Sequence, residues 1–349
     1  MIAARPVLIT GHRGYIGSVM TPYLENAGFH IVGLDTGYFS ASTLIDDQVA
    51  VEEITKDIRD VERNDLADIY AVIHLAALSN DPIGNLNEDW TEDINHRATV
   101  RLATLAKAAS VRRFLFSSSC IMYGMSSLET ADEDSPLQPQ TTYARSKVAS
   151  EEALRGLADD RFHPTYMRNG TVYGLSPRMR FDTVLNNLVA QAITTGRVVV
   201  LSDGTPWRPV VHVEDIARSF HHVLEAPVDA ISDESFNNGS DEMNFRVLEL
   251  AHIAASVVDG AEVVVKSEAG ADQRTYRADF SKFARTFPEF RWKWNAVDGA
   301  RQLADGLRAL GLTKDDLDGN RFVRLRWLNH LLASGELNDN LRWEQATGA

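Results

Sequence analysis

Short apolar runs alternate with longer stretches of helical periodicity through the first half of the chain. Apolar runs of roughly four to eight residues are typical of buried strands, and apolar positions repeating every three or four residues indicate amphipathic helices. The predicted strands are Val7–Thr10, His30–Asp35, Ala71–Leu75, Arg113–Ser117 and Pro164–Arg168. The predicted helices are Tyr15–Ala27, Val61–Ala67, Asn95–Ala109 and Tyr143–Leu157. This alternation predicts an α/β fold with a Rossmann-type, doubly wound parallel sheet.

A glycine-rich turn joins the first predicted strand to the first predicted helix. Gly11, Gly14 and Gly17 follow the strand at once. Such glycines permit a tight turn, a close approach of the backbone to a pyrophosphate, and close packing of helix on strand. The next strand ends at Asp35, 18 residues after Gly17, where a carboxylate can bind the 2′-hydroxyl of an adenosine ribose. The order strand, turn, helix, strand and acid predicts a dinucleotide site.

The choice between the two nicotinamide dinucleotides depends on Asp35. A carboxylate accepts hydrogen bonds from a free ribose diol and repels a 2′-phosphate. The next residues, 36–39, contain no Arg or Lys to neutralise such a phosphate. The sequence therefore predicts NAD rather than NADP, the alternative being an ordinary solvated Asp that closes a strand.

The pattern becomes less regular after residue 168. Short strands are predicted at Val198–Leu201, Val210–Val213, Ser235–Asn238 and Val263–Val265, and helices near Phe181–Thr195, Glu214–Glu225, Val247–Val258 and Arg321–Leu332. We expect residues 1–168 to form the NAD-binding domain, joined by residues 209–226. Residues 169–349 then form a smaller α/β substrate-binding domain with a C-terminal helical tail. The basic tail helix is interpreted as a packing element or a subunit contact.

Composition excludes several classes of partner. Hydrophobic residues make up 44% of the chain and charged residues 24%, as in a globular enzyme. The net charge of −14 repels a nucleic-acid backbone, and no apolar run is long enough to span a membrane. Cys120 is the only cysteine, which excludes an internal disulfide and suits a reducing compartment. The first strand begins too early to leave room for a signal peptide, so the expected location is the cytoplasm.

Candidate catalytic groups follow the fourth predicted strand. Tyr143 and Lys147 stand four residues apart in a predicted helix, so their side chains share one face. An ammonium beside a phenol favours the phenolate, which can accept a proton from an alcohol. Ser117, Ser118 and Ser119 end the strand and should point into the ligand crevice, where one can hydrogen-bond the reacting oxygen. The alternative for the serines is a turn rich in small polar residues.

Five motifs in order resemble the extended short-chain dehydrogenase/reductases. They are Thr10–Gly17, Asp57–Asp60, His74–Ala77, Ser117–Gly124 and Tyr143–Lys147. Within that family the chain is most similar to the nucleotide-sugar epimerases and dehydratases of the UDP-glucose 4-epimerase type. The resemblance covers the chain from about residue 6 to residue 310.

This resemblance implies roles for individual residues and no metal. The implied catalytic residues are Ser119, Tyr143 and Lys147. The implied NAD-binding residues are Gly11, Gly14, Tyr15, Ile16, Gly17, Asp35, Asp57, Ile58, Leu75, Ala76, Ala77, Asn95, Tyr143 and Lys147. The implied substrate-binding residues are Ser119, Thr171, Asn187, Arg208 and Arg274. Of these, the last three are candidates for the substrate's diphosphate, and the alternative for either arginine is an ordinary surface position.

Departures from the family pattern narrow the expected activity. The family's 4,6-dehydratases carry an Asp-Glu pair just after the catalytic Ser or Thr, where this chain has Cys120 and Ile121. Neither can protonate a leaving hydroxyl, so dehydration is disfavoured. Cys120 could assist epimerisation beside a ketone, as in the fucose-synthase branch, but Met122 departs from that branch's spacing and favours a packing role. Thr171 replaces the usual Asn, which leaves the base and sugar open.

Together these features predict an NAD-dependent 4-epimerase of a nucleoside-diphosphate sugar. It would oxidise C4 transiently to a 4-keto intermediate and return the hydride to the opposite face. One alternative is an NAD(P)H-dependent nucleotide-sugar 4-ketoreductase or dehydrogenase. Another is a dinucleotide-sensing binding protein, which would not need the Tyr–Lys pair. The resemblance also implies a homodimer that pairs helices 95–109 and 143–157.

Overall fold

A seven-stranded parallel sheet forms the centre of the computed structural model, which describes residues 5–45, 51–79, 81–125, 129–266 and 274–344. Its strand order is β10-β6-β5-β4-β1-β2-β3. The strands are β1 (Pro6–Thr10), β2 (His30–Asp35), β3 (Glu52–Thr55), β4 (Ala71–His74), β5 (Arg113–Ser119), β6 (His163–Asn169) and β10 (Glu234–Asn238). The order reverses between β1 and β4, and this is where such sheets bind ligands. The predicted Rossmann-type sheet is confirmed.

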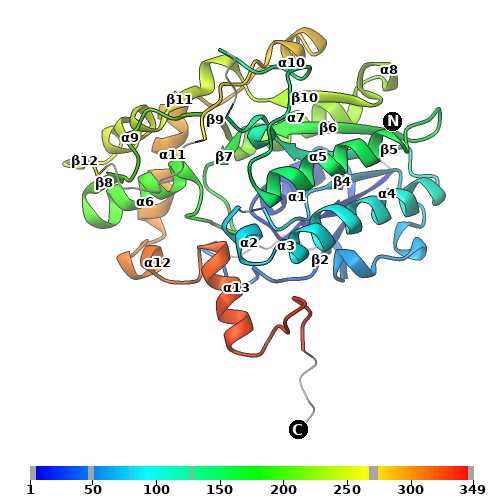
Figure 1. Cartoon of the computed structure of the whole chain (residues 1–349), viewed down its shortest axis with the longest axis horizontal. Coiled ribbons are helices and arrows are strands. Elements are labelled where there is room, and N and C mark those ends of the chain that lie inside the picture. The colour runs from blue at the N-terminus through cyan, green and yellow to red at the C-terminus, as the bar shows by residue number, and fades with distance from the viewer. Residues whose placement is uncertain (1–4, 46–50, 80, 126–128, 267–273, 345–349) are drawn as a thin grey trace.

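Alternating residues of the strands pack against helices on opposite faces of this sheet (Figure 1). Val7 and Ile9 of β1 belong to the core shared with α1 (Gly17–Asn26), α7 (Val213–Glu225) and α10 (Ser281–Thr286). Leu8, between them, belongs to the core shared with α4 (Ala98–Ala108) and α5 (Thr142–Arg155). Full burial of each such aliphatic side chain contributes roughly 1.5–3 kcal/mol, so both helical layers hold the strand ends in fixed positions.

The second half of the chain builds a smaller unit beside the carboxyl ends of the strands, on the left in Figure 1. Its core is formed by α6 (Val184–Thr195), α9 (Val247–Ser256) and α11 (Ala296–Ala309). Two small sheets complete it, made of β8 (Arg197–Val200) with β12 (Glu262–Val265), and of β7 (Thr171–Tyr173), β9 (Trp207–His212) and β11 (Asn244–Arg246). The chain returns to the large sheet twice, as α7 against α1 and as strand β10 at the sheet edge.

Two helical predictions differ from the structure. Val61–Ala67 was expected to be a helix, but the segment forms short 3₁₀ turns at Ile58–Asp60 and Arg63–Leu66. Asp57 caps the start of the first turn, and Glu62 with Asp65 caps the start of the second. The backbone is extended at Glu62, between the turns, and again at Ala67, so no longer helix forms. The helix expected from Phe181 begins instead at Val184. Residues 180–182 therefore lie in a loop, which bears on the site below.

The remaining helical elements are short connectors and the C-terminal helix. They are α2 (Asp81–Leu86), α3 (Glu88–Thr91), a π-helical turn (Glu92–Arg97), 3₁₀ turns at Cys120–Tyr123 and Asp241–Met243, α8 (Val228–Ile231), α12 (Lys314–Asp318) and α13 (Arg324–Ala333). Leu328 and Leu331 of α13 pack into the core of the large sheet's α4–α5 side, so α13 is a packing element. In the described ranges no helix combines the length and the apolar character needed to cross a membrane.

Candidate active site

A cavity of about 660 Å³ opens at the carboxyl ends of β1, β2, β4 and β5 and reaches into the smaller unit. It brings together residues that are far apart in the sequence. The predicted site residues that line it are Gly11, Gly14, Tyr15, Ile16, Gly17, Asp35, Asp57, Ile58, Leu75, Ala76, Ala77, Ser119, Tyr143, Lys147, Thr171, Asn187, Arg208 and Arg274. One wall therefore comes from the large sheet and the other from the smaller unit.

The glycine turn has the geometry of a phosphate cradle. Gly11 has a φ of +75°, in the left-handed region that side chains disfavour. A Cβ at Gly17 would stand 2.2 Å from the Gly11 carbonyl oxygen, so only glycine lets α1 begin so close to the turn. A Cβ at Gly14 would stand 3.0 Å from the same oxygen. The bare backbone and the N-terminus of α1 together fit a dinucleotide's diphosphate.

Asp35 ends β2 with its carboxylate fixed by the backbone. Its two oxygens accept hydrogen bonds from the N–H groups of Arg13, at 3.1 Å, and Gly37, at 2.7 Å. Burial raises the pKa of Asp35, and those hydrogen bonds oppose the rise. Lys56 also lines the cavity, but its ammonium is paired with Asp65 at 2.7 Å. This end of the cavity therefore suits an uncharged ribose diol better than a 2′-phosphate.

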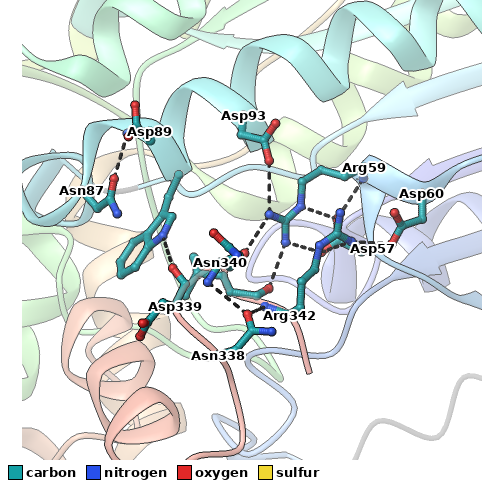
Figure 2. Close-up of polar contacts among 12 residues, drawn as sticks. Asp57, Arg59, Asp60, Asn87, Asp89, Asp93, Asn338, Asp339, Asn340 and Arg342 are labelled. Carbon is teal, nitrogen blue, oxygen red and sulfur yellow. Dashed lines mark hydrogen bonds and ion pairs between the residues drawn. The ribbon is translucent and has the colours of Figure 1, made fainter. Parts of the chain in front are cut away.

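The segment after α13 folds back over the loop that follows β3 (Figure 2), and it also contacts Tyr38 in the loop that follows β2. Arg59 donates hydrogen bonds to the carbonyl oxygens of Asn340, at 2.8 Å, and Leu341, at 2.9 Å. Arg342 pairs with Asp57 at 3.4 Å and also contacts Asp60. Asp57 is thus held between two guanidinium groups. Burial pushes the pKa of Asp57 upward, but hydrogen bonds from Arg59 outweigh burial and hold it below its usual range.

Reversing the charge of Arg342 is expected to loosen this end of the cavity. Arg342→Glu places a carboxylate beside Asp57 and Asp60 and so repels the C-terminal segment from the loop that lines the cavity. Exposed ion pairs contribute roughly 0.2–1 kcal/mol each, so affinity for NAD should fall about three- to tenfold. Calorimetric titration of NAD measures this. Arg326→Glu, on the exposed face of α13, is the control, and an equal loss in both variants would contradict the prediction.

Tyr143 and Lys147 occupy successive turns of α5 and both line the cavity. The Lys147 ammonium donates a hydrogen bond to the Ser117 carbonyl oxygen at 2.7 Å and lies 5.7 Å from the centre of the Tyr143 ring. It also lies 4.5 Å from the centre of the Phe116 ring. Lys147 is only 3% exposed, and burial lowers its pKa to about 7, against the opposing charge of Glu151. The Lys147 amine therefore lies beside the phenol on one helix face and changes its charge close to neutral pH.

Lys147→Met is expected to be more stable than the wild type at pH 6 and to lose that advantage by pH 9.5. Below a pH of about 7 the folded protein carries a buried charge, which costs stability. Between about 7 and 10.5 the unfolded chain holds a proton that the folded chain has released, so wild-type stability rises with pH. The difference in the free energy of unfolding between Lys147→Met and the wild type should shrink by roughly 2–3 kcal/mol from pH 6 to pH 9.5. Urea unfolding across this range measures it.

A matched lysine tests whether the effect belongs to the buried site. Lys314 lies on the exposed α12, so Lys314→Met should follow the wild-type stability curve at a constant offset from pH 6 to 9.5. If the curve of Lys147→Met also runs parallel to the wild type, the ammonium of Lys147 is not held at a lowered pKa.

The three serines at the end of β5 have different surroundings. The Ser117 hydroxyl oxygen accepts a hydrogen bond from the Asn169 side chain at 3.0 Å. Ser118 donates to Glu151 at 2.6 Å. The Ser119 oxygen accepts only a weak bond from the Ile121 N–H, at 3.3 Å, among the contacts in the described residues. Ser119 is therefore the serine best placed to bind a reacting oxygen.

Four predicted substrate-binding residues face this group from the smaller unit. Thr171 is the first residue of β7, and Asn187 lies in the first turn of α6, where its side chain donates to the Phe181 carbonyl oxygen at 2.9 Å. Arg208 of β9 donates to the carbonyl oxygen of Arg274. The two arginines are thus neighbours on the same cavity wall, as the predicted diphosphate site requires.

Two residues considered for the site, Asn95 and Cys120, are not among the described residues that line the cavity. Asn95, expected to bind the cofactor, instead bonds both backbone groups of Leu78 through its side chain, at 2.7 and 3.1 Å. It supports the loop that carries the cavity wall. Cys120 is fully buried, with its thiol 3.0 Å from the Arg168 carbonyl oxygen. Burial raises the pKa of Cys120, which favours the packing role.

Residues 7–239 match a known family, described as the NAD dependent epimerase/dehydratase family. The chain belongs to this family. UDP-glucose 4-epimerase of Bacillus subtilis is 29% identical over 289 residues, covering 74% of this chain and 83% of that protein. The low-salt glycan biosynthesis protein Agl12 of Haloferax volcanii is 27% identical over 312 residues, covering 86% of this chain and 97% of that protein.

Solved structures of similar fold include a dehydratase and a complex with a nucleotide sugar and NAD. TunA, an NAD dependent NDP-hexosamine 5,6-dehydratase of tunicamycin biosynthesis, superposes with a TM-score of 0.78 at 25% identity over 87% of this chain and 98% of its own. MoeE5 in complex with UDP-glucuronic acid and NAD has a TM-score of 0.76 at 26% identity over 87% and 99%. The predicted family and the predicted cofactor, NAD, are confirmed.

Sequence reasoning missed two arginines that line the cavity of this family member. Arg180 lies in the loop before α6, and Arg324 is the first residue of α13. No motif in the sequence includes Arg180, because the loop before α6 that carries it was not predicted. Arg324 follows a long stretch without family motifs, and only the tertiary fold brings it to the cavity. In the described residues no cluster of His, Cys, Asp and Glu could hold a metal ion.

Proposed function

We propose that this protein is an NAD-dependent 4-epimerase of a nucleoside-diphosphate sugar. The observation that carries the proposal is the cavity itself, which combines a dinucleotide cradle, the Ser119–Tyr143–Lys147 group and a basic wall. Family membership limits the choice to epimerases, dehydratases and related enzymes. The relatives named UDP-glucose 4-epimerase favour the first of these.

The acids around the cavity also favour epimerisation over dehydration. Asp35, Asp57 and Asp182 are the carboxylates among the described residues that line it. The first two lie at the predicted adenosine end, and Asp182 is paired with Arg180 at 2.6 Å. Ile121, directly beyond the 3₁₀ turn's first residue, lines the cavity where the family's dehydratases have an acid. No described carboxyl group is therefore free to protonate a leaving hydroxyl next to Ser119.

The mechanism follows from the roles of three side chains. Tyr143 removes the proton from the sugar's 4-hydroxyl and later returns it, while Lys147 stabilises the phenolate. Ser119 donates a hydrogen bond to the same oxygen in both half-reactions. Bound NAD supplies the hydride acceptor at C4 and the donor for the return. Arg208, Arg274 and Asn187 hold the diphosphate and so leave the sugar ring able to turn between the two steps.

A screen of substrates tests the proposal. The purified protein is incubated with UDP-, GDP-, dTDP- and CDP-linked hexoses in deuterated buffer, without added NADH, and the products are followed by proton NMR. We expect interconversion of one 4-epimeric pair with protium retained at C4, because the hydride does not exchange with solvent. Catalytic amounts of bound NAD should suffice for many turnovers.

Three outcomes would contradict the proposal. Stoichiometric consumption of added NAD(P)H with a keto sugar would establish the ketoreductase alternative. Loss of water with deuterium incorporated into the sugar would establish a dehydratase. Saturable binding of NAD without conversion of any nucleotide sugar would indicate that the protein is a dinucleotide-binding protein of the same fold and not an enzyme.

A further inference from the structure

Arg324 is a buried cation inside the cavity without a full set of partners. It is 3% exposed and begins α13, packed with its guanidinium 4.4 Å from the centre of the Phe39 ring. Its Nη2 donates to the Arg178 carbonyl oxygen at 3.0 Å. Its Nη1 has no hydrogen-bond partner among the described residues and is shielded from solvent. A buried N–H of a charged group left without an acceptor is costly, so this arrangement implies an absent acceptor.

The charges around Arg324 do not balance. Arg180 lies beside it, and Asp182 is the acid that offsets this pair, being bonded to Arg180 at 2.6 Å. Burial, followed by the charge of Arg180, lowers the pKa of Arg324 to about 9, with Asp182 opposing. The pocket therefore holds a surplus of positive charge that an anionic ligand would neutralise.

The position of the two arginines identifies which anion they face. Both act electrostatically on Tyr15, which belongs to the glycine turn. Arg180 donates to the hydroxyl of Ser79 at 3.0 Å, just beyond Ala77 at the end of β4. Arg324 stacks on Phe39, just beyond the ribose-binding Asp35. Three segments that line the dinucleotide half of the cavity thus surround the pair, whereas Arg208 and Arg274 belong to the opposite wall.

We propose that Arg324, together with Arg180, binds the diphosphate of NAD from the side opposite the glycine turn. The glycine turn supplies backbone N–H groups, and the arginines supply charge and bidentate hydrogen bonds. The free Nη1 of Arg324 gains an oxygen acceptor, and the surplus charge is neutralised. The C-terminal helix is in this way a part of the cofactor site and not only a packing element.

Binding measurements on Arg324→Met test the proposal. Methionine keeps the apolar contact with Phe39 and removes the charge. Hydrogen bonds between charged groups contribute more binding free energy than neutral ones. The dissociation constants of NAD and of ADP-ribose should therefore both rise about tenfold or more. The dissociation constant of UDP, a probe for the substrate's diphosphate site, should change less than twofold. Arg324→Lys, which keeps the charge without the fork, should fall between the wild type and Arg324→Met.

Controls separate binding from folding and from catalysis. Arg326→Met removes the same charge from the exposed face of α13 and should bind NAD as the wild type does. Thermal unfolding without ligand should show Arg324→Met folded, and NAD should raise its melting temperature less than it raises that of the wild type. Because no turnover is measured, a failure of the proposed 4-epimerisation would not affect this result.

Two results would overturn the proposal. One is an unchanged affinity of Arg324→Met for NAD and ADP-ribose, with or without a lower melting temperature, which would make Arg324 a structural residue. The other is weaker binding of UDP with NAD unaffected, which would assign the arginine to the substrate's diphosphate.

Discussion

Tyr143→Phe is expected to lower kcat by about 10²- to 10⁴-fold, the usual contribution of a positioned acid–base group. The phenylalanine keeps the ring that lines the cavity and removes only the oxygen that accepts and returns the proton. NAD should stay bound, because the glycine turn and Asp35 are untouched. The measurement is the initial rate of 4-epimer interconversion with whichever nucleotide sugar the screen identifies, alongside a titration of NAD.

Tyr70→Phe is the matched control for this change. Tyr70 directly precedes the central strand β4, at the amino ends of the strands and so at the end of the sheet opposite the cavity, where its hydroxyl accepts a hydrogen bond from Arg113 at 3.2 Å. Removing that hydroxyl should leave kcat within about twofold of the wild type. Full activity of Tyr143→Phe would refute the assigned mechanism, because the oxygen of Tyr143 would then not be needed to accept the proton of the 4-hydroxyl.

Glu151→Leu is expected to cost about 3–5 kcal/mol of folding free energy, the usual effect of removing one partner of a buried ion pair. Glu151 and Arg168 are 2% and 4% exposed and bond through two nitrogens of the guanidinium, the shortest contact being 2.8 Å. Glu151 also accepts the bond from Ser118 at 2.6 Å. The pair ties α5 to β5 and β6, with Glu151 one helical turn after Lys147. Urea or thermal unfolding measures the loss.

A double variant distinguishes a lost ion pair from a general packing defect. Glu151→Leu combined with Arg168→Met leaves no uncompensated charge, so it should recover a large part of the stability lost in Glu151→Leu. Arg168 also bonds Tyr123 and the Glu133 carbonyl oxygen, so the recovery will not be complete. A double variant that is less stable than Glu151→Leu by the full effect of Arg168→Met alone would show no coupling between the two residues.

Local patterns in the sequence were sufficient to predict every strand of the large sheet except β3, and to select the candidate catalytic residues that line the cavity. The central strands β1, β4 and β5 are buried on both faces, so their apolar runs are nearly continuous and easily recognised, whereas the edge strand β3 is largely exposed or half-buried and has no such run. The glycine turn, Asp35 and the Tyr143–Lys147 pair depend on spacings of a few residues within one or two elements. Such spacings fix relative position through the geometry of the turn or helix, whatever the rest of the chain does.

Features that depend on distant packing could not be predicted in this way. Arg324 reaches the cavity only because α13 docks on the large sheet. Its guanidinium is positioned there by stacking on Phe39, which is 285 positions earlier in the sequence. The direction of the Cys120 side chain depends on the 3₁₀ turn that follows β5. Residues 61–67 have helical periodicity, but side-chain caps divide the segment into short turns. For Arg324 a tertiary contact decides the outcome, whereas for Cys120 and residues 61–67 local backbone geometry outweighs what the apolar pattern predicts.

The closure of the adenosine end by the C-terminal segment sets a limit on when the protein can acquire its nucleotide. The hydroxyl of Tyr38 bonds the carbonyl oxygen of Leu341, a contact between residues 303 positions apart. During synthesis, the early strands can pair long before residues 338–343 have left the ribosome. The growing chain would therefore present an open, weakly binding cleft until residues 338–343 have been synthesised and have docked. Tight binding of nucleotide then requires this segment, however early the strands of the sheet have paired.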